Sequence, residues 1–205
     1  MLRKQEVFIT KWVRMINQEI KDFCENWIEK AKEYNNENLQ DVFDKFFTLF
    51  VVYNRLYVEA TFRMSNKGEI NIQNRNSFPD PQAAKNYVIQ YLNSGNINDV
   101  FNADEHCVLA IERLKDIIRN HEFNIKLNMV TGIPEREKDL NLLSKMESMH
   151  TDRRIKAIAD FIYSIRCNVF HAQKGYVQNQ IYVLNPVNII LMKLIDLLFE
   201  KLKNE

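Results

Sequence analysis

The segment from Asp41 to Ser65, DVFDKFFTLFVVYNRLYVEATFRMS, decides the fold class. Its apolar and aromatic residues cover most of the circumference of a helix instead of forming one stripe, and neither glycine nor proline interrupts them. A helix that is apolar on all sides is surrounded by other elements. We therefore predict that this segment is the central helix of a helical bundle.

The rest of the chain also shows helical periodicity. Only four glycines and four prolines occur in 205 residues, too few for the turns of a many-stranded sandwich or barrel. A loop is predicted at residues 66–81 and a chain break at 131–134. Further helices are predicted over residues 4–34, 81–92, 98–120, 135–149, 151–171 and, from the start signal Asn185-Pro186, 185–202. We expect one all-α domain, residues 1–205, of about six or seven helices.

The overall charge excludes two classes of protein. Lys and Arg number 28 and Asp and Glu number 27, so the net charge is +1. A strongly basic nucleic-acid coat protein and a strongly acidic tail protein are both excluded, whereas an enzyme that contacts nucleic acid at one small site is not. For such an enzyme, the near-neutral net charge predicts a narrow range of substrates or a low basal activity.

Cysteine and histidine spacing predicts neither a disulfide framework nor a metal site. The three cysteines lie far apart without a CxxC pair, and the four histidines lack zinc-binding spacing. We expect no cofactor and no metal. The N-terminal MLRKQEVFITKW lacks the apolar core of a signal peptide, and polar residues interrupt the uncharged run Gly175–Met192. We expect a reduced, soluble, cytoplasmic protein without a membrane partner.

The predicted helix at 151–171 carries the residues that suggest chemistry. Its apolar positions step by three and four, and this seam is predicted to pack within the bundle or across a dimer; the positions are Ile155, Ile158, Ile162, Ile165 and Val169. Arg166, Asn168 and His171 follow in the string IRCNVFHAQKGY. Arginine offers a fixed fork of donors to phosphate oxygens, and histidine exchanges protons near neutral pH. These side chains suit phosphodiester cleavage.

Helix geometry restricts how these three residues can act together. Arg166 and His171 are five apart, about 140° around an ideal helix, so they do not share a face, whereas Asn168 and His171 do. Either the helix loosens before Gly175 or a second chain completes the pair. The spacing alone also fits an arginine beside the core and a histidine at a helix C-terminus, which the helix dipole favours there.

The wider string Arg-Cys-Asn-Val-Phe-His-Ala-Gln-Lys-Gly resembles the signature of HEPN domains. Their motif is Arg-x4-6-His, often written R-N/C-N-L-F-H-G-x-K in bacterial members. The stretch FFTLFVVYNRLY, residues 46–57, is similar to the aromatic-rich central helix of that family. The resemblance covers this helix and the last 55 or so residues, and residues 66–149 match by helical character alone.

The resemblance implies a HEPN-like bundle that forms a homodimer and places two motifs in one cleft. Active members are metal-independent endoribonucleases of bacterial toxin–antitoxin, abortive-infection and CRISPR-linked defence systems. By this resemblance Arg166 would hold the scissile phosphate, His171 would act as acid or base, and Asn168 would orient the site. RNA would be the substrate, with an antitoxin or regulatory protein as partner.

Two departures from the family pattern stand out. Cys167 follows the arginine where many members have Asn, Asp or His, so the activity of the site stays open. The Arg-x4-His-x-Tyr form of members paired with a nucleotidyltransferase antitoxin is absent, so that partnership is not expected. The alternative function is a non-catalytic HEPN-like module that binds RNA or protein.

Basic residues near the motif are candidates for binding RNA. Arg153, Arg154 and Lys156 form a small basic patch at the start of the same helix, and Lys174 follows His171. Such side chains contact RNA phosphates. Nearby Asp152 and Asp160 dilute the patch, so an ordinary solvated helix face is an equal alternative.

Overall fold

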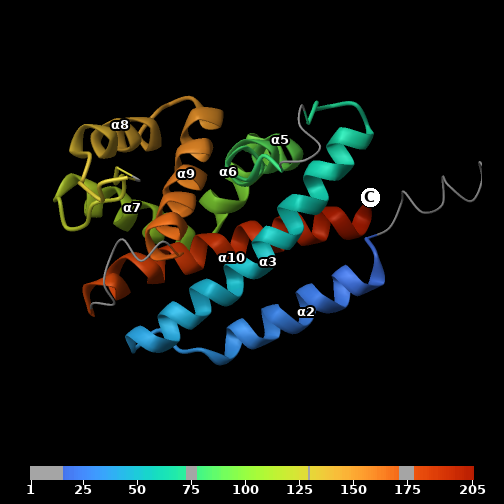
Figure 1. Ribbon diagram of the computed structural model, residues 1–205, viewed down its shortest axis with the longest axis horizontal. Coiled ribbons are helices and arrows are strands. Elements are labelled where there is room, and N and C mark those ends of the chain that lie inside the picture. The colour runs from blue at the N-terminus through green and yellow to red at the C-terminus, as the bar shows by residue number, and fades with distance from the viewer. Residues whose placement is uncertain (1–15, 73–77, 129, 171–177) are drawn as a thin grey trace, which may run out of the picture.

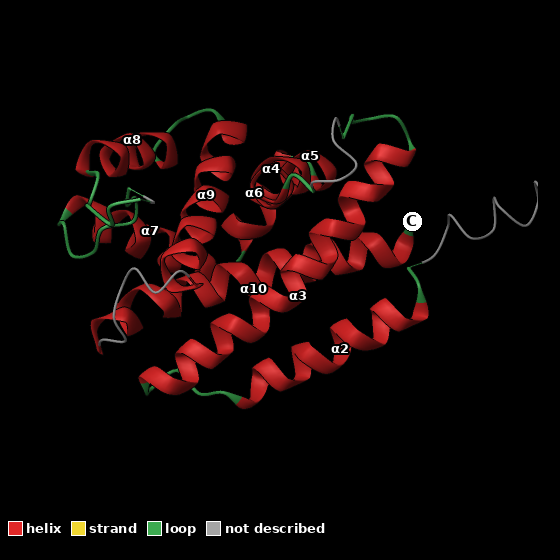
Figure 2. Ribbon diagram, in the orientation of Figure 1, coloured by secondary structure: helices red, strands yellow, loops and turns green. Residues whose placement is uncertain are grey.

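The computed structural model describes residues 16–72, 78–128, 130–170 and 178–205. This part of the chain is all-helical and contains no strand, as predicted (Figure 2). The elements are α2 (Gln18–Glu33), α3 (Leu39–Asn66), α4 (Asp80–Gln82), the π-helical turn η1 (Ala83–Tyr87), α5 (Val88–Leu92), α6 (Ser94–Ala103), α7 (Glu105–Arg119), α8 (Arg136–Met146), α9 (Thr151–Phe170), the 3₁₀ turn η2 (Gln178–Gln180) and α10 (Ile181–Asn204).

Helices α3 and α10 form the centre of the bundle. They cross each other, with α2 along α3 and α7 against α10 (Figure 1). Most apolar side chains of α3 are buried, and Phe46, Leu56 and Tyr57 completely so, whereas Phe62 near its C-terminal end is 49% exposed. The predicted central helix is therefore confirmed. Its burial follows from the lack of a polar face, which leaves every side of the helix to be covered.

Helix α10 also has the length and composition of a membrane-spanning helix. Residues 178–204 have a mean hydropathy of 1.7 in their most apolar window. In the structure α10 packs against α3 and α7, and its Asn188 side chain donates to the Val42 carbonyl of α3 at 3.0 Å. A buried helix in the middle of a bundle meets the same length and composition criteria, and α10 is such a core helix here.

Three predicted helix boundaries are wrong. The helix expected over residues 4–34 begins at Gln18, because Asn17 is its N-cap and accepts from the Glu19 amide; residues 4–15 lie outside the described residues. The helix expected over residues 98–120 is two helices, α6 and α7, because Asp104 has extended backbone angles and its carboxylate accepts from the His106 and Cys107 amides as an N-cap. The last helix begins at Ile181 and not at the Asn185-Pro186 signal. Pro186 lies inside this helix and leaves the Tyr182 carbonyl without the usual helical donor.

Helix α9 packs on α8, α6 and η1 through its apolar seam. The four isoleucines of the seam, Ile155, Ile158, Ile162 and Ile165, are each 1% exposed. The seam is thus buried inside a single chain, which selects packing within the bundle over packing across a dimer. The opposite face of α9 is only partly buried and carries the exposed Arg153.

Candidate functional site

Arg166 lies near the C-terminal end of α9, half-buried between α9 and α3. Its guanidinium carbon is 5.7 Å from the ring centre of Phe50 on α3 and 5.8 Å from that of Tyr163 on α9. Both distances are within the range of cation–π attraction. The two rings therefore restrict the orientation of the planar guanidinium group.

A carboxylate and two phenols lie beside Arg166. The hydroxyls of Tyr57 and Tyr163 donate to the two oxygens of Asp80, from Tyr163 at 2.8 Å. Burial raises the pKa of both phenols, the Asp80 carboxylate raises it further, and the positive charge of Arg166 partly opposes the shift. Both tyrosines consequently stay protonated and remain donors at neutral pH. This cluster joins α3, α4 and α9 around the arginine.

Asn168, two residues after Arg166, faces another part of the molecule. Its side chain is 2% exposed, and its Nδ2 donates to the Ile125 carbonyl at 2.9 Å. The structure therefore does not bring Asn168 to the guanidinium of Arg166. The Asn168 side chain holds the Ile125 peptide in place through this bond.

The peptide that Asn168 holds belongs to residues 123–128, between α7 and α8. From its other side the Asp139 carboxylate of α8 accepts from the Ile125 amide at 3.2 Å and from the Lys126 amide at 2.7 Å. Burial raises the pKa of Asp139, although these two amides favour its charged form. The two contacts fix the backbone from which the Lys126 side chain extends.

Lys126 reaches a carboxylate in the middle of α9. Its ammonium group donates to Asp160 at 2.6 Å and to Ser164 at 2.8 Å, and Lys85 of η1 donates to the other Asp160 oxygen at 3.0 Å. Burial of Asp160 would raise its pKa, but Lys126 and Lys85 more than offset burial, so the net pKa is lowered. One carboxylate thus holds two lysines from distant parts of the chain.

The arginines of the basic patch predicted at the start of α9 lie on two different faces of that helix. Arg153 is exposed and lies with Lys156 and Lys85 along one cavity. Arg154 turns the other way, where it bonds the Asn98 side chain and lines a separate cavity with Phe101 and Ile158. Of the two predicted RNA-binding arginines, the structure places only Arg153 on the same face as Asp160.

Two predicted site residues, His171 and Lys174, lie outside the described residues. The structure therefore gives no geometry for the Arg166–His171 pair. Within the described ranges, no group of three His, Cys, Asp or Glu side chains is arranged to hold a metal ion. Burial raises the pKa of the Cys24 and Cys107 thiols to about 11, so both are protonated core residues.

The sequence interpretation missed most of the residues around Arg166 and Asp160. The sequence does contain a signal for the face of α9 opposite the isoleucine seam. Four residues lie there at helical spacing: Arg153, Lys156, Asp160 and Tyr163. No such signal existed for Lys85, Lys126 and Asp80, which come from other elements. Only the tertiary packing of these elements brings them to α9.

Comparison of the chain with protein-family models, with curated proteins and with solved structures finds no match. The function is therefore inferred from the residues of the site.

Proposed function

We propose that this protein is a HEPN-like endoribonuclease that works in the cytoplasm as a homodimer, without a metal ion, in a bacterial defence or toxin–antitoxin type of system. The observation that carries the proposal is the position of Arg166. Its guanidinium, restrained by Phe50 and Tyr163 at the end of α9, lies five residues before a histidine that can exchange protons at neutral pH.

In the proposed reaction the RNA supplies its own nucleophile. His171 takes the proton of a ribose 2′-hydroxyl, and the 2′-oxygen attacks the adjacent phosphorus. The bond from phosphorus to the 5′-oxygen breaks, and the partner subunit's His171, in its protonated form, gives a proton to that oxygen. The products are a 2′,3′-cyclic phosphate and a free 5′-hydroxyl. Each proton transfer contributes about 10²–10⁴ in rate.

Arg166 acts on the negative charge that develops at the phosphorus. Its two parallel N–H donors match two non-bridging oxygens, a geometry that the single ammonium group of lysine does not offer. Preorganised donors of this kind contribute about 10²–10³ in rate. Asn168 supports the site indirectly, through the 123–128 segment.

Cleavage of a mixed-sequence RNA by the purified protein tests this proposal. We expect activity in the presence of EDTA, cyclic-phosphate ends, and no cut where the ribose is replaced by deoxyribose. His171→Ala and Arg166→Lys should each remove at least 99% of the rate, since each role is worth about 10²-fold or more. His150→Ala, an exposed histidine at the other end of α9, is the matched control and should cleave normally.

Three results would contradict the proposal. They are normal cleavage by His171→Ala, equal cleavage of single-stranded DNA, and loss of activity on chelation with recovery on adding magnesium or manganese. The second candidate function is a non-catalytic HEPN-like module that binds RNA. It is favoured by the concentration of positive charge along α9, which requires no catalysis, and it would replace the enzyme if no RNA is cut.

A further inference from the structure

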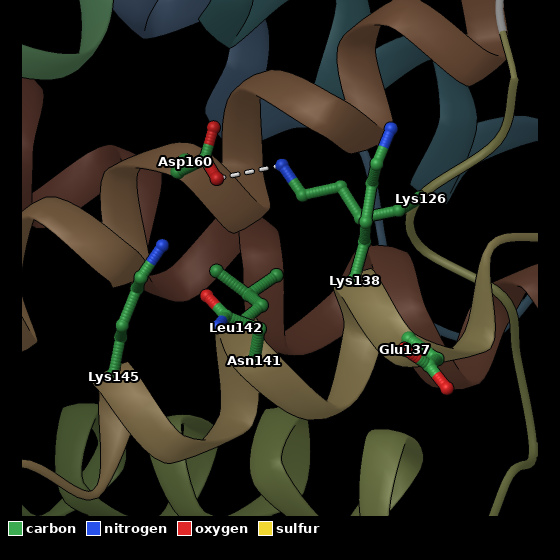
Figure 3. A pocket seen from close by; sticks show the side chains of 7 residues that line it. All are labelled: Lys126, Glu137, Lys138, Asn141, Leu142, Lys145 and Asp160. Carbon is green, nitrogen blue, oxygen red and sulfur yellow. Dashed lines mark hydrogen bonds and ion pairs between the residues drawn. The ribbon is translucent and has the colours of Figure 1, made fainter.

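Two adjoining cavities form a continuous groove along α9. One, of about 430 Å³, lies between α8, α9 and the 123–128 segment, and the other, of about 340 Å³, lies between α9 and η1. Lys145 and Asp160 line both cavities. We call the combined surface the α8–α9 groove. Figure 3 shows the first cavity, with Lys126 extending across it to Asp160.

The α8–α9 groove carries an excess of positive charge. Three carboxylates line it, Glu137, Asp152 and Asp160. Six cationic side chains line it as well: Lys85, Lys126, Lys138, Lys145, Arg153 and Lys156. The whole chain has a net charge of only +1, so this surface is far more positive than the molecule on average.

Several of these charges are already compensated by neighbouring carboxylates. Asp160 holds Lys85 and Lys126, Asp152 holds Lys156 at 2.8 Å, and Glu135 holds Lys138 at 2.7 Å. Among the described residues, no ion pair is formed by Lys145 or Arg153, and both side chains are exposed.

Figure 3 shows the Lys145 ammonium group on the side of the cavity that faces Asp160, while the Glu137 carboxylate points away from it. Among the described residues, the groove therefore contains two cations without an ion-pair partner, Lys145 and Arg153. Its carboxylate Asp160 is already paired with Lys85 and Lys126. The positive charge of Lys145 and Arg153 favours the binding of an anionic ligand.

The groove leads toward Arg166. The Lys85 ammonium group lies 5.5 Å from the ring centre of Tyr163, and the Arg166 guanidinium lies 5.8 Å from the same ring. From Arg153 to Arg166 is thirteen residues of helix, or about 20 Å. The charge is spread along this length and does not converge on one point, which suits an extended polyanion better than a single phosphate.

We infer that the α8–α9 groove binds successive phosphates of the single-stranded RNA that flanks the cleavage site, with Lys145 and Arg153 as the principal contacts. The inference rests on the proposed function. Among the described residues, no aromatic side chain lines either cavity, so the groove contacts backbone and not stacked bases. Backbone contacts bind RNA without regard to its sequence.

The salt dependence of binding tests the inference directly. A fluorescent 20-nucleotide single-stranded RNA is titrated by anisotropy with protein that carries His171→Ala, so that the probe stays intact. Each lost phosphate contact reduces the slope of log K against log salt by about 0.7 for a single strand. Lys145→Ala with Arg153→Ala should therefore reduce the slope by about 1.4. The matched control is Lys21→Ala with Lys30→Ala on α2, and it should keep the original slope.

The same change has a visible effect on affinity. Between 50 and 200 mM salt, a difference of 1.4 in slope means that the parent protein loses about sevenfold more affinity than the groove variant. An unchanged slope in the groove variant would overturn the inference. So would displacement of the RNA by poly-glutamate at an equal concentration of charge, because the groove would then select acidic protein as readily as RNA.

Failure of the inference and failure of the proposed function give different results. With His171 intact, Lys145→Ala with Arg153→Ala should raise KM for RNA, whereas Arg166→Lys should lower kcat. If the protein cleaves no RNA but the groove variant loses salt-dependent binding, RNA binding by the α8–α9 groove is supported and the proposed ribonuclease activity is refuted. If RNA is cut and the groove variant binds RNA like its parent, the proposed ribonuclease activity is supported and RNA binding by the α8–α9 groove is refuted.

Discussion

Replacement of Asn168 by alanine separates a positioning role from a catalytic one. In the structure the Asn168 amide is 2% exposed and donates to the Ile125 carbonyl at 2.9 Å. Alanine removes this donor and leaves a buried carbonyl without it, at a cost of about 1–3 kcal/mol. For a domain of this size, each 1 kcal/mol lowers Tm by about 2–4 °C. We expect a loss of about 2 kcal/mol and a Tm lower by about 4–8 °C.

Asn188→Ala provides a matched control for this prediction. Asn188 is 3% exposed and donates to the Val42 carbonyl at 3.0 Å, so it makes the same kind of hydrogen bond, but it lies in the contact of α10 with α3 and its buried Oδ1 has no partner among the described residues. Urea unfolding should show a loss of free energy in Asn168→Ala that is larger than in Asn188→Ala, because the latter change also removes a buried oxygen that has no hydrogen-bond partner. Hydrogen exchange should accelerate at the Ile125 and Lys126 amides only in Asn168→Ala, because only this variant releases the 123–128 segment.

Two results would refute the reasoning. One is a loss below about 0.5 kcal/mol in Asn168→Ala, which is within the range of ordinary surface substitutions. The other is exchange at Ile125 and Lys126 that stays equal to that of the wild type while RNA cleavage is lost. In that case the Asn168 side chain would act on the RNA itself.

Three further substitutions test the packing and the charges around α9. Because the pKa of Asp160 is lowered in the folded protein, its ionised form stabilises the fold above the unfolded pKa near 3.8. Asp160→Asn should therefore reduce the free energy of unfolding at pH 7, and in urea titrations its difference from the wild type should shrink below about pH 4. A difference that stays constant with pH would show that Lys85 and Lys126 are not its partners. Phe161→Ala, at a completely buried ring of α9, should cost about 3–5 kcal/mol in the same assay, and a cost below 1 kcal/mol would contradict the burial. Asp104→Ala should cost about 1–2 kcal/mol, because it removes the N-cap of α7 together with the 2.6 Å ion pair to Lys193. The exposed Asp99→Ala is the control and should be near zero, and equal effects of the two would rule out both contacts.

The sequence by itself determined the class of fold and its centre. Residues 41–65 have no polar face, and the structure surrounds them as α3, residues 39–66. The isoleucine spacing from Ile155 to Ile165 likewise predicted the buried face of α9. These features are local: a side-chain period of 3.6 residues is written in consecutive positions and survives in any helical arrangement.

Helix boundaries were less certain because their signals compete. Asp104 is a good N-cap residue, yet the apolar periodicity continues through it, and the sequence interpretation followed the periodicity. Pro186 is a common first-turn residue, yet tertiary contacts of Val183 and Leu184, both buried, extend α10 ahead of it. Burial of Val183 and Leu184 accounts for the early start of α10, whereas at Asp104 the N-cap hydrogen bonds end one helix and begin the next.

Only the tertiary structure decided what surrounds Arg166. Asp160 meets Lys126 from 34 residues away and Lys85 from 75, and Tyr163 meets Asp80 from 83. It also separated the two arginines of the basic patch and turned Asn168 into the core. Contacts between residues this far apart depend on how whole helices dock, and docking is set by the sum of many weak apolar contacts that no single stretch of sequence contains.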